Sequence, residues 1–209
     1  MAKLKMARTT VPEKRYPAIA IIEFNSIAAG ITAGDAMVKK APLELVKAGT
    51  VHPGKYLVMV GGEVAPVDES YREGLRIRPE TIVDHVILPH IHQQVHDAVL
   101  GIKVANKAEA LGVIETSTVA ANVEAADSAV KGAEVVVLEI RLADNLGGNS
   151  FALFGGKVED VESAIQIGTQ RIEDKDITIN TTVIPNIDRL MAGQIDSSSY
   201  FYIDKKAKA

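Results

Sequence analysis

Several groups of side chains in the sequence have types and spacings that binding sites use. The segment from Gly49 to Lys55, GTVHPGK, nearly matches the phosphate-binding pattern of Gly, four residues, then Gly-Lys. That pattern next requires Ser or Thr, and Tyr56 stands there. The segment is also expected to join two strands, whereas a phosphate loop opens a helix whose amides hold the anion. These two departures argue against a nucleotide site.

Histidines form a second group, because four of the five lie between His85 and His96. His92 and His96 are four residues apart, so a helix would place both imidazoles on one face. Metal binding requires a third ligand, which no carboxylate spacing identifies, and the Glu of the hydrolytic HExxH motif is missing. We therefore interpret this segment as a polar surface helix.

An internal repeat organises the chain. Residues 19–41 and 111–133 are identical at nine of 23 positions when they are shifted by 92. About one or two identities are expected from composition alone. The match continues from Gly61-Gly62 to Gly155-Gly156 and from Pro89 to Pro185. Two copies of about 90 residues fit the 209-residue chain better than one continuous domain. We place the domains at residues 17–105 and 106–194, with terminal extensions at 1–16 and 195–209.

The repeat places charged residues at matching positions. Glu23 and Glu115 lie on corresponding strands, which raises the possibility of an acid–base pair. A structural role at a subunit junction, accepting backbone hydrogen bonds, is the better interpretation. Each copy also has Asp-x-x-x-Lys on a predicted helix, ending at Lys39 and Lys131. By itself, such an i, i+4 pair contributes only a few tenths of a kcal/mol.

The elements expected around these residues have the same order in both copies. Apolar runs at 18–24 and 111–116 predict buried strands. A helix follows each, and in the first copy Ile27, Ile31, Gly34 and Val38 fall on one face. The remaining strands are expected at 43–51, 55–60, 134–142 and 150–154, with second helices from residues 65 and 159 and last strands ending at 88 and 184. This βαββαβ order predicts an α/β (α+β) chain of two tandem ferredoxin-like domains.

Composition excludes several classes of protein. The chain has no Cys, which rules out disulfides and thiolate-based zinc or iron–sulfur sites. A net charge of −4 gives no reason to expect nucleic-acid binding, and the apolar runs are too short to span a membrane. Lys3, Lys5, Arg8, Lys14 and Arg15 form a basic N-terminal arm without a secretory signal core, and an organelle transit peptide is the alternative.

The repeated segments resemble bacterial microcompartment shell proteins. The resemblance rests on AIAIIEFNSIAAGITAGDAMVKKA and LGVIETSTVAANVEAADSAVKGA, on HPGKYLVMVGGEV and GGNSFALFGGKV, and on the ends LPHIH and IPNID. It covers residues 17–192 and implies the tandem-domain class, in which three chains form a pseudohexameric tile. The order of elements resembles the non-permuted propanediol-utilisation type of trimer. The expected function is therefore structural and non-enzymatic, in the shell of a microcompartment in the bacterial cytoplasm, with metabolites passing a central pore.

The resemblance also assigns residues to the pore and to the tile edge. The pore-lining residues would be Val51, His52, Pro53, Gly54, Leu146, Gly147 and Gly148. Where the resembled trimer has a cluster-ligating Cys, this sequence has His52. The edge residues would be Lys39 and Lys131, with His90 and Asn186 at the positions where single-domain relatives often have Arg. Three His52 imidazoles around one axis would favour anionic or neutral polar solutes, most strongly below about pH 6.5.

Two other functions stay open at this point. Three copies of His52 could bind a metal or support a redox cofactor, which would make the tile an electron carrier, although we expect no resident cofactor. An unrelated ferredoxin-like trimer that senses a small ligand is the second alternative. An enzyme ranks third, since no complete catalytic set is found. The partners we expect are two further copies of the chain and other shell proteins, with no nucleic acid or membrane.

Overall fold

The computed structural model describes residues 15–201, and the segments 1–14 and 202–209 lie outside the described residues. Lys3, Lys5, Arg8 and Lys14 of the predicted basic arm fall in that outside part. Arg15 is described, and its guanidinium pairs with Asp97 at 2.7 Å. No helix in residues 15–201 is long and apolar enough to cross a membrane.

Both repeats fold in the predicted order. The first contains β1 (Ala18–Phe24), α1 (Ile27–Lys40), β2 (Leu45–Val51), β3 (Lys55–Gly62), α2 (Val64–Arg76) and β4 (Ile82–Leu88), with a 3-10 turn at Pro79–Thr81. The second contains β5 (Ala110–Thr116), α4 (Val119–Gly132), β6 (Val136–Leu142), β7 (Ser150–Gly156), α5 (Val158–Arg171) and β8 (Ile179–Ile184). Two further helices, α3 (Gln93–Val99) and α6 (Arg189–Ser197), follow the last strand of each repeat.

Each repeat forms a four-stranded antiparallel sheet. The strand orders are β2-β3-β1-β4 and β6-β7-β5-β8, which is the ferredoxin-like order in both cases. The two registers agree at the repeated Glu, because Glu23 lies opposite Asp84 and Glu115 lies opposite Asn180. A bulge interrupts the β1–β4 pairing after Glu23, and another interrupts the β6–β7 pairing after Val137. Away from these two bulges, residues of one domain can be compared with their counterparts in the other.

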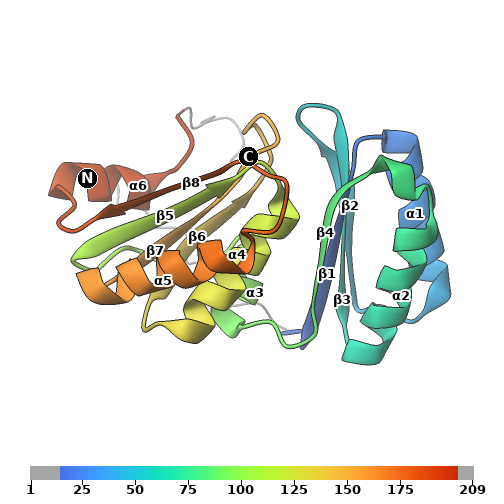
Figure 1. Ribbon diagram of the computed structural model, residues 1–209, viewed down its shortest axis with the longest axis horizontal. Coiled ribbons are helices and arrows are strands. Elements are labelled where there is room, and N and C mark those ends of the chain that lie inside the picture. Colours follow the sequence, from blue (N-terminus) through green and yellow to red (C-terminus); the bar gives the residue numbers. More distant parts are fainter. Residues whose placement is uncertain (1–14, 202–209) are drawn as a thin grey trace, which may run out of the picture.

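The two domains stack so that the first sheet is covered on both faces. In Figure 1, α1 and α2 cover one face of this sheet, and the second domain lies against the other. Helix α4 contacts β1 and β4 there. Side chains on that face of the sheet, including Ile19, Ile21 and Met59, belong to the same core cluster as Val119 and Val123 of α4. The second domain therefore completes the core of the first.

Helix α1 packs on its own sheet through small side chains. Ser26 caps its N-terminus by accepting a hydrogen bond from the Ala29 amide at 3.3 Å. A Cβ atom at Gly30 would lie only 2.5 Å from Cδ1 of Tyr56, so the close approach of helix and strand requires glycine. The buried residues of the helix are Ala29, Gly30, Ala33 and Met37.

The apolar stripe predicted on α1 faces away from its own sheet. Ile27, Ile31 and Val38 are 42%, 54% and 48% exposed. Their counterparts in α4 are Val119, Val123 and Val130, which are 0%, 0% and 7% exposed. The two helices have the same pattern, but only the stripe of α4 has a second sheet packed on it.

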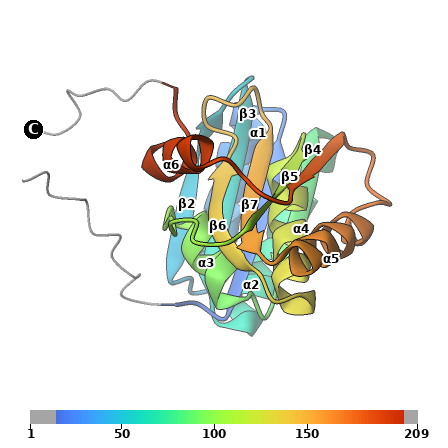
Figure 2. The ribbon, with the colours of Figure 1, turned by 90° about the vertical axis from the view of Figure 1, so that its left-hand side faces the viewer.

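The second sheet is covered differently on its two faces. Figure 2 shows α4 and α5 on one side of it and α6 on the other. Every residue of α6 is exposed or half-buried, and Leu190 is 86% exposed. Between α6, the segment that follows it and the sheet lies a mainly apolar hollow of about 550 Å³, lined by Leu111, Val113, Phe151 and Leu153 among others.

The prediction of a polar surface helix around His92 and His96 is wrong. His92 lies at the N-cap of α3, outside the helix, and only His96 is within it. His96 is buried, and its Nε2 accepts a hydrogen bond from the Tyr16 amide at 3.1 Å. Helix α3 packs against β6 and α4, so Val95 and Val99 are buried as well. The histidines obscured this apolar face in the sequence.

Candidate functional site: the interdomain joint and the pore loops

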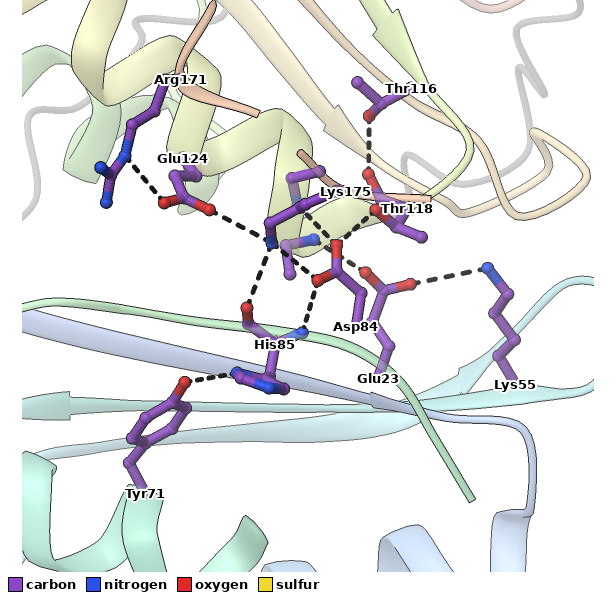
Figure 3. Close-up of polar contacts among 12 residues, drawn as sticks. Glu23, Lys55, Tyr71, Asp84, His85, Thr116, Thr118, Glu124, Arg171 and Lys175 are labelled. Atoms are coloured by element: carbon purple, nitrogen blue, oxygen red, sulfur yellow. Dashed lines mark hydrogen bonds and ion pairs between the residues drawn. The ribbon is translucent and has the colours of Figure 1, made fainter. Parts of the chain in front are cut away.

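The joint between the domains is built where the first sheet meets the N-terminus of α4 (Figure 3). Glu23 projects from β1 and is fully buried. Its Oε1 accepts a hydrogen bond from the Ala120 amide at 2.7 Å, and its Oε2 lies 3.6 Å from the Lys55 ammonium. Amides in the first turn of a helix have no internal partner, so this carboxylate satisfies one of them.

Burial sets the protonation of Glu23. It raises the pKa of this carboxyl from 4.5 to about 7, against the lowering effects of the Ala120 amide and Lys55. Asp84 on the neighbouring strand raises this pKa further through its charge. Glu23 accepts a backbone hydrogen bond, as predicted, but it does so at the joint between the two domains of one chain and not at a subunit junction. The alternative of a catalytic pair with Glu115 is not supported, since the two lie on different sheets.

Asp84 supplies a second carboxylate to the same helix end. Its Oδ2 accepts hydrogen bonds from Thr118 Oγ1 at 2.6 Å and from the Ala121 amide at 3.1 Å. Its Oδ1 accepts from the Lys175 ammonium at 2.7 Å. Thr118 does not cap α4 with its own side chain, and Asp84 takes that role from the other domain. The two domains are therefore joined by charged hydrogen bonds as well as by apolar packing.

A wider network surrounds Asp84. Lys175 also pairs with Glu124 at 3.1 Å, and Glu124 pairs with Arg171 at 2.9 Å. On the other side of β4, the Tyr71 hydroxyl and His85 Nδ1 are 2.5 Å apart. Burial raises the pKa of Tyr71 to about 12 and lowers that of His85, so both groups are held neutral near pH 7.

The second sheet has only part of this arrangement. Glu115 accepts a hydrogen bond from the Asn149 side chain at 2.9 Å. Asn149 is the counterpart of Lys55, and Asn180 is the counterpart of Asp84. Two charged residues of the first sheet are thus neutral amides in the second.

Asp84, Lys175 and Glu124 were not predicted from the sequence. Comparison of the two copies could have found Asp84, because the position beside the repeated Glu is charged in the first copy and neutral in the second. Lys175 and Glu124 gave no comparable signal.

The two predicted pore loops lie beside each other. Residues 52–54 connect β2 to β3, and residues 143–149 connect β6 to β7. Both loops project at the top of Figure 1. A Cβ atom at Gly148 would lie 2.9 Å from Cδ of Pro53 and 3.0 Å from the His52 carbonyl oxygen. Gly54, Gly147 and Gly148 have φ angles of 88°, 63° and 91°, which suits glycine at these turns.

Within one chain, the predicted pore residues differ in exposure. His52, Pro53, Gly54 and Gly147 are exposed, Leu146 is half-buried, and Val51 and Gly148 are buried. The loop after β2 joins two strands, as expected, and therefore does not form a phosphate-binding loop. No group of three or more His, Asp or Glu side chains that could hold a metal occurs among residues 15–201.

The structure brings two of the four predicted edge residues together. Lys131 donates to the His90 carbonyl at 2.6 Å and pairs with Asp127 at 2.5 Å. Asp127 also accepts a hydrogen bond from the His92 amide at 2.7 Å. The end of the first domain is thus fixed to the edge of the second.

The other two predicted edge residues are apart in one chain. Lys39 pairs with Asp35 at 2.6 Å on an exposed surface. Asn186 is exposed between β8 and α6.

Comparison with known families decides the class of protein. The model of the BMC domain matches the chain twice, over residues 18–91 and 110–187. The chain belongs to the BMC domain family. It is 38% identical over 168 residues to the bacterial microcompartment shell protein PduT of Citrobacter freundii, covering 80% of this chain and 91% of the relative. These matches confirm the resemblance to tandem-domain shell proteins that the sequence predicted.

Solved structures agree with this assignment. A microcompartments protein from Desulfitobacterium hafniense is 37% identical, with a TM-score of 0.73 over 83% of this chain and 97% of the other. A fused permuted hexameric shell protein from the RMM microcompartment shares the fold, with a TM-score of 0.54 and 22% identity over 75% and 84% of the two chains. This BMC protein is structural and not an enzyme, and its place is the shell of a bacterial microcompartment within the cytoplasm.

Proposed function

We propose that three copies of this BMC protein close into a pseudohexameric tile with a central pore. Tiles then join along their edges, with one another and with other shell proteins, and metabolites pass through the pore. Family membership supports the shell role.

The difference in exposure between α1 and α4 carries this proposal. The stripe of α4 is covered by the first sheet of the same chain. The matching stripe of α1 is about half exposed, and the matching face of the second sheet borders the apolar hollow. These two surfaces, the second of which is partly covered by α6 in a single chain, are the counterparts of the two halves of the joint already formed inside the chain. The second sheet of one protomer would therefore pack on α1 of the next.

Such a joint runs head to tail, because the two surfaces are different. Head-to-tail contacts give a ring when the rotation closes and a filament when it does not. If each joint repeats the geometry of the intrachain joint, domains of alternating type follow one another around one axis. The tandem-domain class that the sequence resembles closes with six domains, which means three chains. Each new joint would bury Ile27, Ile31 and Val38 for about 1 kcal/mol each, since each is already half covered.

Helix α6 fits the same scheme. Its counterpart α3 leaves the first domain and packs against β6 and α4 of the second. By the repeat, α6 would pack against β2 and α1 of the next protomer. Leu190 and Met191, which are 86% and 55% exposed in a single chain, support a partner for this helix.

The pore would be lined by three copies of each loop. The contact of Gly148 with Pro53 and His52 supports the alternation of the two loops around the axis. Three His52 side chains would then form a polar constriction that favours anionic or neutral polar metabolites. In tiles, His52→Ala should change the passage of an anionic solute more than that of a cationic one. Unchanged passage would argue against a gating role.

We further propose that the tile carries no resident cofactor. A metal held by three His52 copies is the competing outcome, and metal analysis of purified trimers decides between them. One equivalent of zinc, nickel or iron per trimer that disappears in His52→Ala would favour the electron-carrying alternative.

Native mass spectrometry tests the proposed assembly. The expected species is a trimer of about 67 kDa, three times the chain mass of 22.3 kDa. A monomer or dimer at micromolar concentration would contradict the proposal. Flat hexagonal arrays in negative-stain micrographs would support the tile against a soluble ligand sensor.

A further inference from the structure

A hollow at the N-terminus of α1 is the open counterpart of the site that receives two carboxylates at α4. Its volume is about 370 Å³, and it is lined by Ser26, Ala28, Ala29, Thr32, Arg76, Ile77 and Arg78. At α4, the corresponding position takes Glu23 and Asp84 from the first sheet. The hollow at α1 therefore lies where a sheet would pack if α1 were covered in the same way as α4.

The amides at the two helix ends differ in one respect. At α4, Glu23 binds the second amide of the helix, from Ala120, and Asp84 binds the third, from Ala121. At α1, Ser26 of the same chain already binds the third amide, from Ala29. The second amide, from Ala28, is one for which an α-helix has no internal acceptor. A single carboxylate is thus enough to complete α1.

The second sheet presents one carboxylate in the required place. Glu115 is the counterpart of Glu23, and Asn180 stands where the first sheet has Asp84. The second sheet therefore offers one carboxylate and not two. One is sufficient, because Ser26 already accepts the hydrogen bond of the third amide of α1.

We propose that Glu115 of one protomer enters this hollow in the next protomer and accepts a hydrogen bond from the Ala28 amide. This inference rests on the proposed trimer and identifies the polar contact that holds it. Asn149, which donates to Glu115 at 2.9 Å, fixes the carboxylate from its own chain. Arg76 and Arg78 at the rim of the hollow pair within their own domain with Glu73 at 3.8 Å and Glu80 at 2.7 Å. Arg76, whose pair is long, is the cation left to attract the entering anion.

The occupant of the hollow is a second copy of this chain and not a free anion. A free anion would satisfy the amide and leave the stripe of Ile27, Ile31 and Val38 exposed. The second sheet would bind the amide and also bury the stripe, because Glu115 lies on the same face as the apolar residues Leu111 and Phe151. In the intrachain joint, one sheet likewise supplies Glu23 together with Ile19 and Ile21.

Trimer dissociation measured by dilution in mass photometry tests the role of Glu115. Glu115→Ala should lower the association constant of each joint about 10- to 100-fold, the range for a hydrogen bond to a charged group. Glu115→Gln keeps an acceptor oxygen and should lose less. Glu162→Ala, which removes an exposed carboxylate on α5, is the matched control and should behave as the parent protein.

A second variant keeps the test valid if Glu115→Ala fails to fold. Arg76 is largely exposed, so Arg76→Glu should leave the protomer folded and weaken the trimer by placing an anion beside Glu115. The effects of Arg76→Glu and Glu115→Gln should be less than additive if the two residues meet across the joint.

The possible failures are distinguishable. If the parent protein is a trimer and Glu115→Ala and Arg76→Glu both leave its dissociation unchanged, the role of Glu115 is wrong and the trimer stands. If the parent protein is a monomer, the trimer and the role of Glu115 are both wrong.

Discussion

Helices α1 and α4 are the same element of the two repeats, and they differ in what covers them. The stripe of α4 is buried under a sheet that belongs to the same chain, while the stripe of α1 is about half exposed. The polar residues that face the two helices also differ, since those of the first sheet are charged and two of their counterparts are neutral. The first sheet brings Lys55 and Asp84 to α4, whereas the second sheet has Asn149 and Asn180 at these positions.

Physical cost explains why the first sheet has charges at these positions and the second sheet has neutral amides. Removing charged groups from water is costly, and the cost is recovered only when every partner is in place. In the intrachain joint the partners are always present, because they are covalently linked. A joint between chains must remove water from its polar groups each time it forms. The free energy needed to remove water from an amide is smaller than that for a charged group. In the proposed joint between chains, one carboxylate, Glu115, would bind the helix terminus, where Glu23 and Asp84 both bind in the intrachain joint.

A charged residue introduced into each apolar stripe should give the largest difference between the two joints. Val123→Asp introduces a charge at a fully buried site of α4 and should prevent folding, at a cost of more than about 4 kcal/mol. Ile31→Asp changes the matching residue of α1, which is 54% exposed, and should give a folded monomer. Circular dichroism and native mass spectrometry distinguish these outcomes. A folded trimer from Ile31→Asp would break the comparison.

The two edge lysines, Lys39 and Lys131, should affect how tiles join into flat arrays and not how three chains form one tile. Lys39→Asp combined with Lys131→Asp should abolish flat arrays, since the lysine stems and ammonium groups would contact neighbouring tiles. Trimers should stay intact despite the loss of the bond from Lys131 to the His90 carbonyl, because that bond is partly exposed. Electron microscopy with native mass spectrometry measures both. Normal arrays from the double variant would show that the edge is misplaced.

The pH dependence of folding should reveal the buried carboxyl of the intrachain joint. Glu23 has a pKa of about 7 in the folded protein and about 4.5 when unfolded, so between these values the folded state binds more protons. The contribution of Glu23 to stability should therefore be greatest below pH 4.5, fall as the pH rises, and level off above pH 7, with a total loss of about 3 kcal/mol.

Glu23→Gln cannot ionise and should lack that decline. Urea unfolding of the parent and the variant at several pH values measures the difference, which isolates Glu23 from other titrating groups. Glu162→Gln is the control on an exposed site. A constant difference between Glu23→Gln and the parent across pH 5 to 8 would contradict the assignment.

The cations around Asp84 should give the smallest effects. Lys175 is 24% exposed and pairs with both Asp84 and Glu124. Lys175→Met should cost about 2 kcal/mol, less than a fully buried pair because water reaches the ammonium. Arg171 is 60% exposed and pairs only with Glu124 among the described residues, so Arg171→Met should cost under about 1 kcal/mol. Equal costs in urea unfolding would mean that burial does not control these pairs.

The repeat allowed most of the fold to be predicted from sequence. Periodicity and matching segments gave both sheets and four helices, with boundaries within two residues for most elements. Helix α6 was missed, because in one chain it has no buried face that a pattern would reveal. The face of α3 was misjudged because His96 looks polar and is in fact buried as a hydrogen-bond acceptor.

The site was less accessible than the fold. Glu23 stood out because it repeats as Glu115, and its structural role followed from that. Asp84 and Lys175 are 91 residues apart in the chain, and only tertiary structure brings them to 2.7 Å. The apolar stripe of α1 was visible in the sequence, but the sequence does not say whether its partner surface is in the same chain or in another.

Cross-linking across the proposed joint tests the trimer most directly. In the proposed trimer, Asn180 of one protomer would face Ser26 of the next, as Asp84 faces Thr118 inside the chain. Because the chain has no Cys, Ser26→Cys with Asn180→Cys provides the only two thiols. Mild oxidation should give a covalent ladder that ends at three chains, about 67 kDa on the 22.3 kDa chain mass, and neither single variant should form it. A ladder that continues beyond three chains, or no interchain product at all, would contradict the closed trimer.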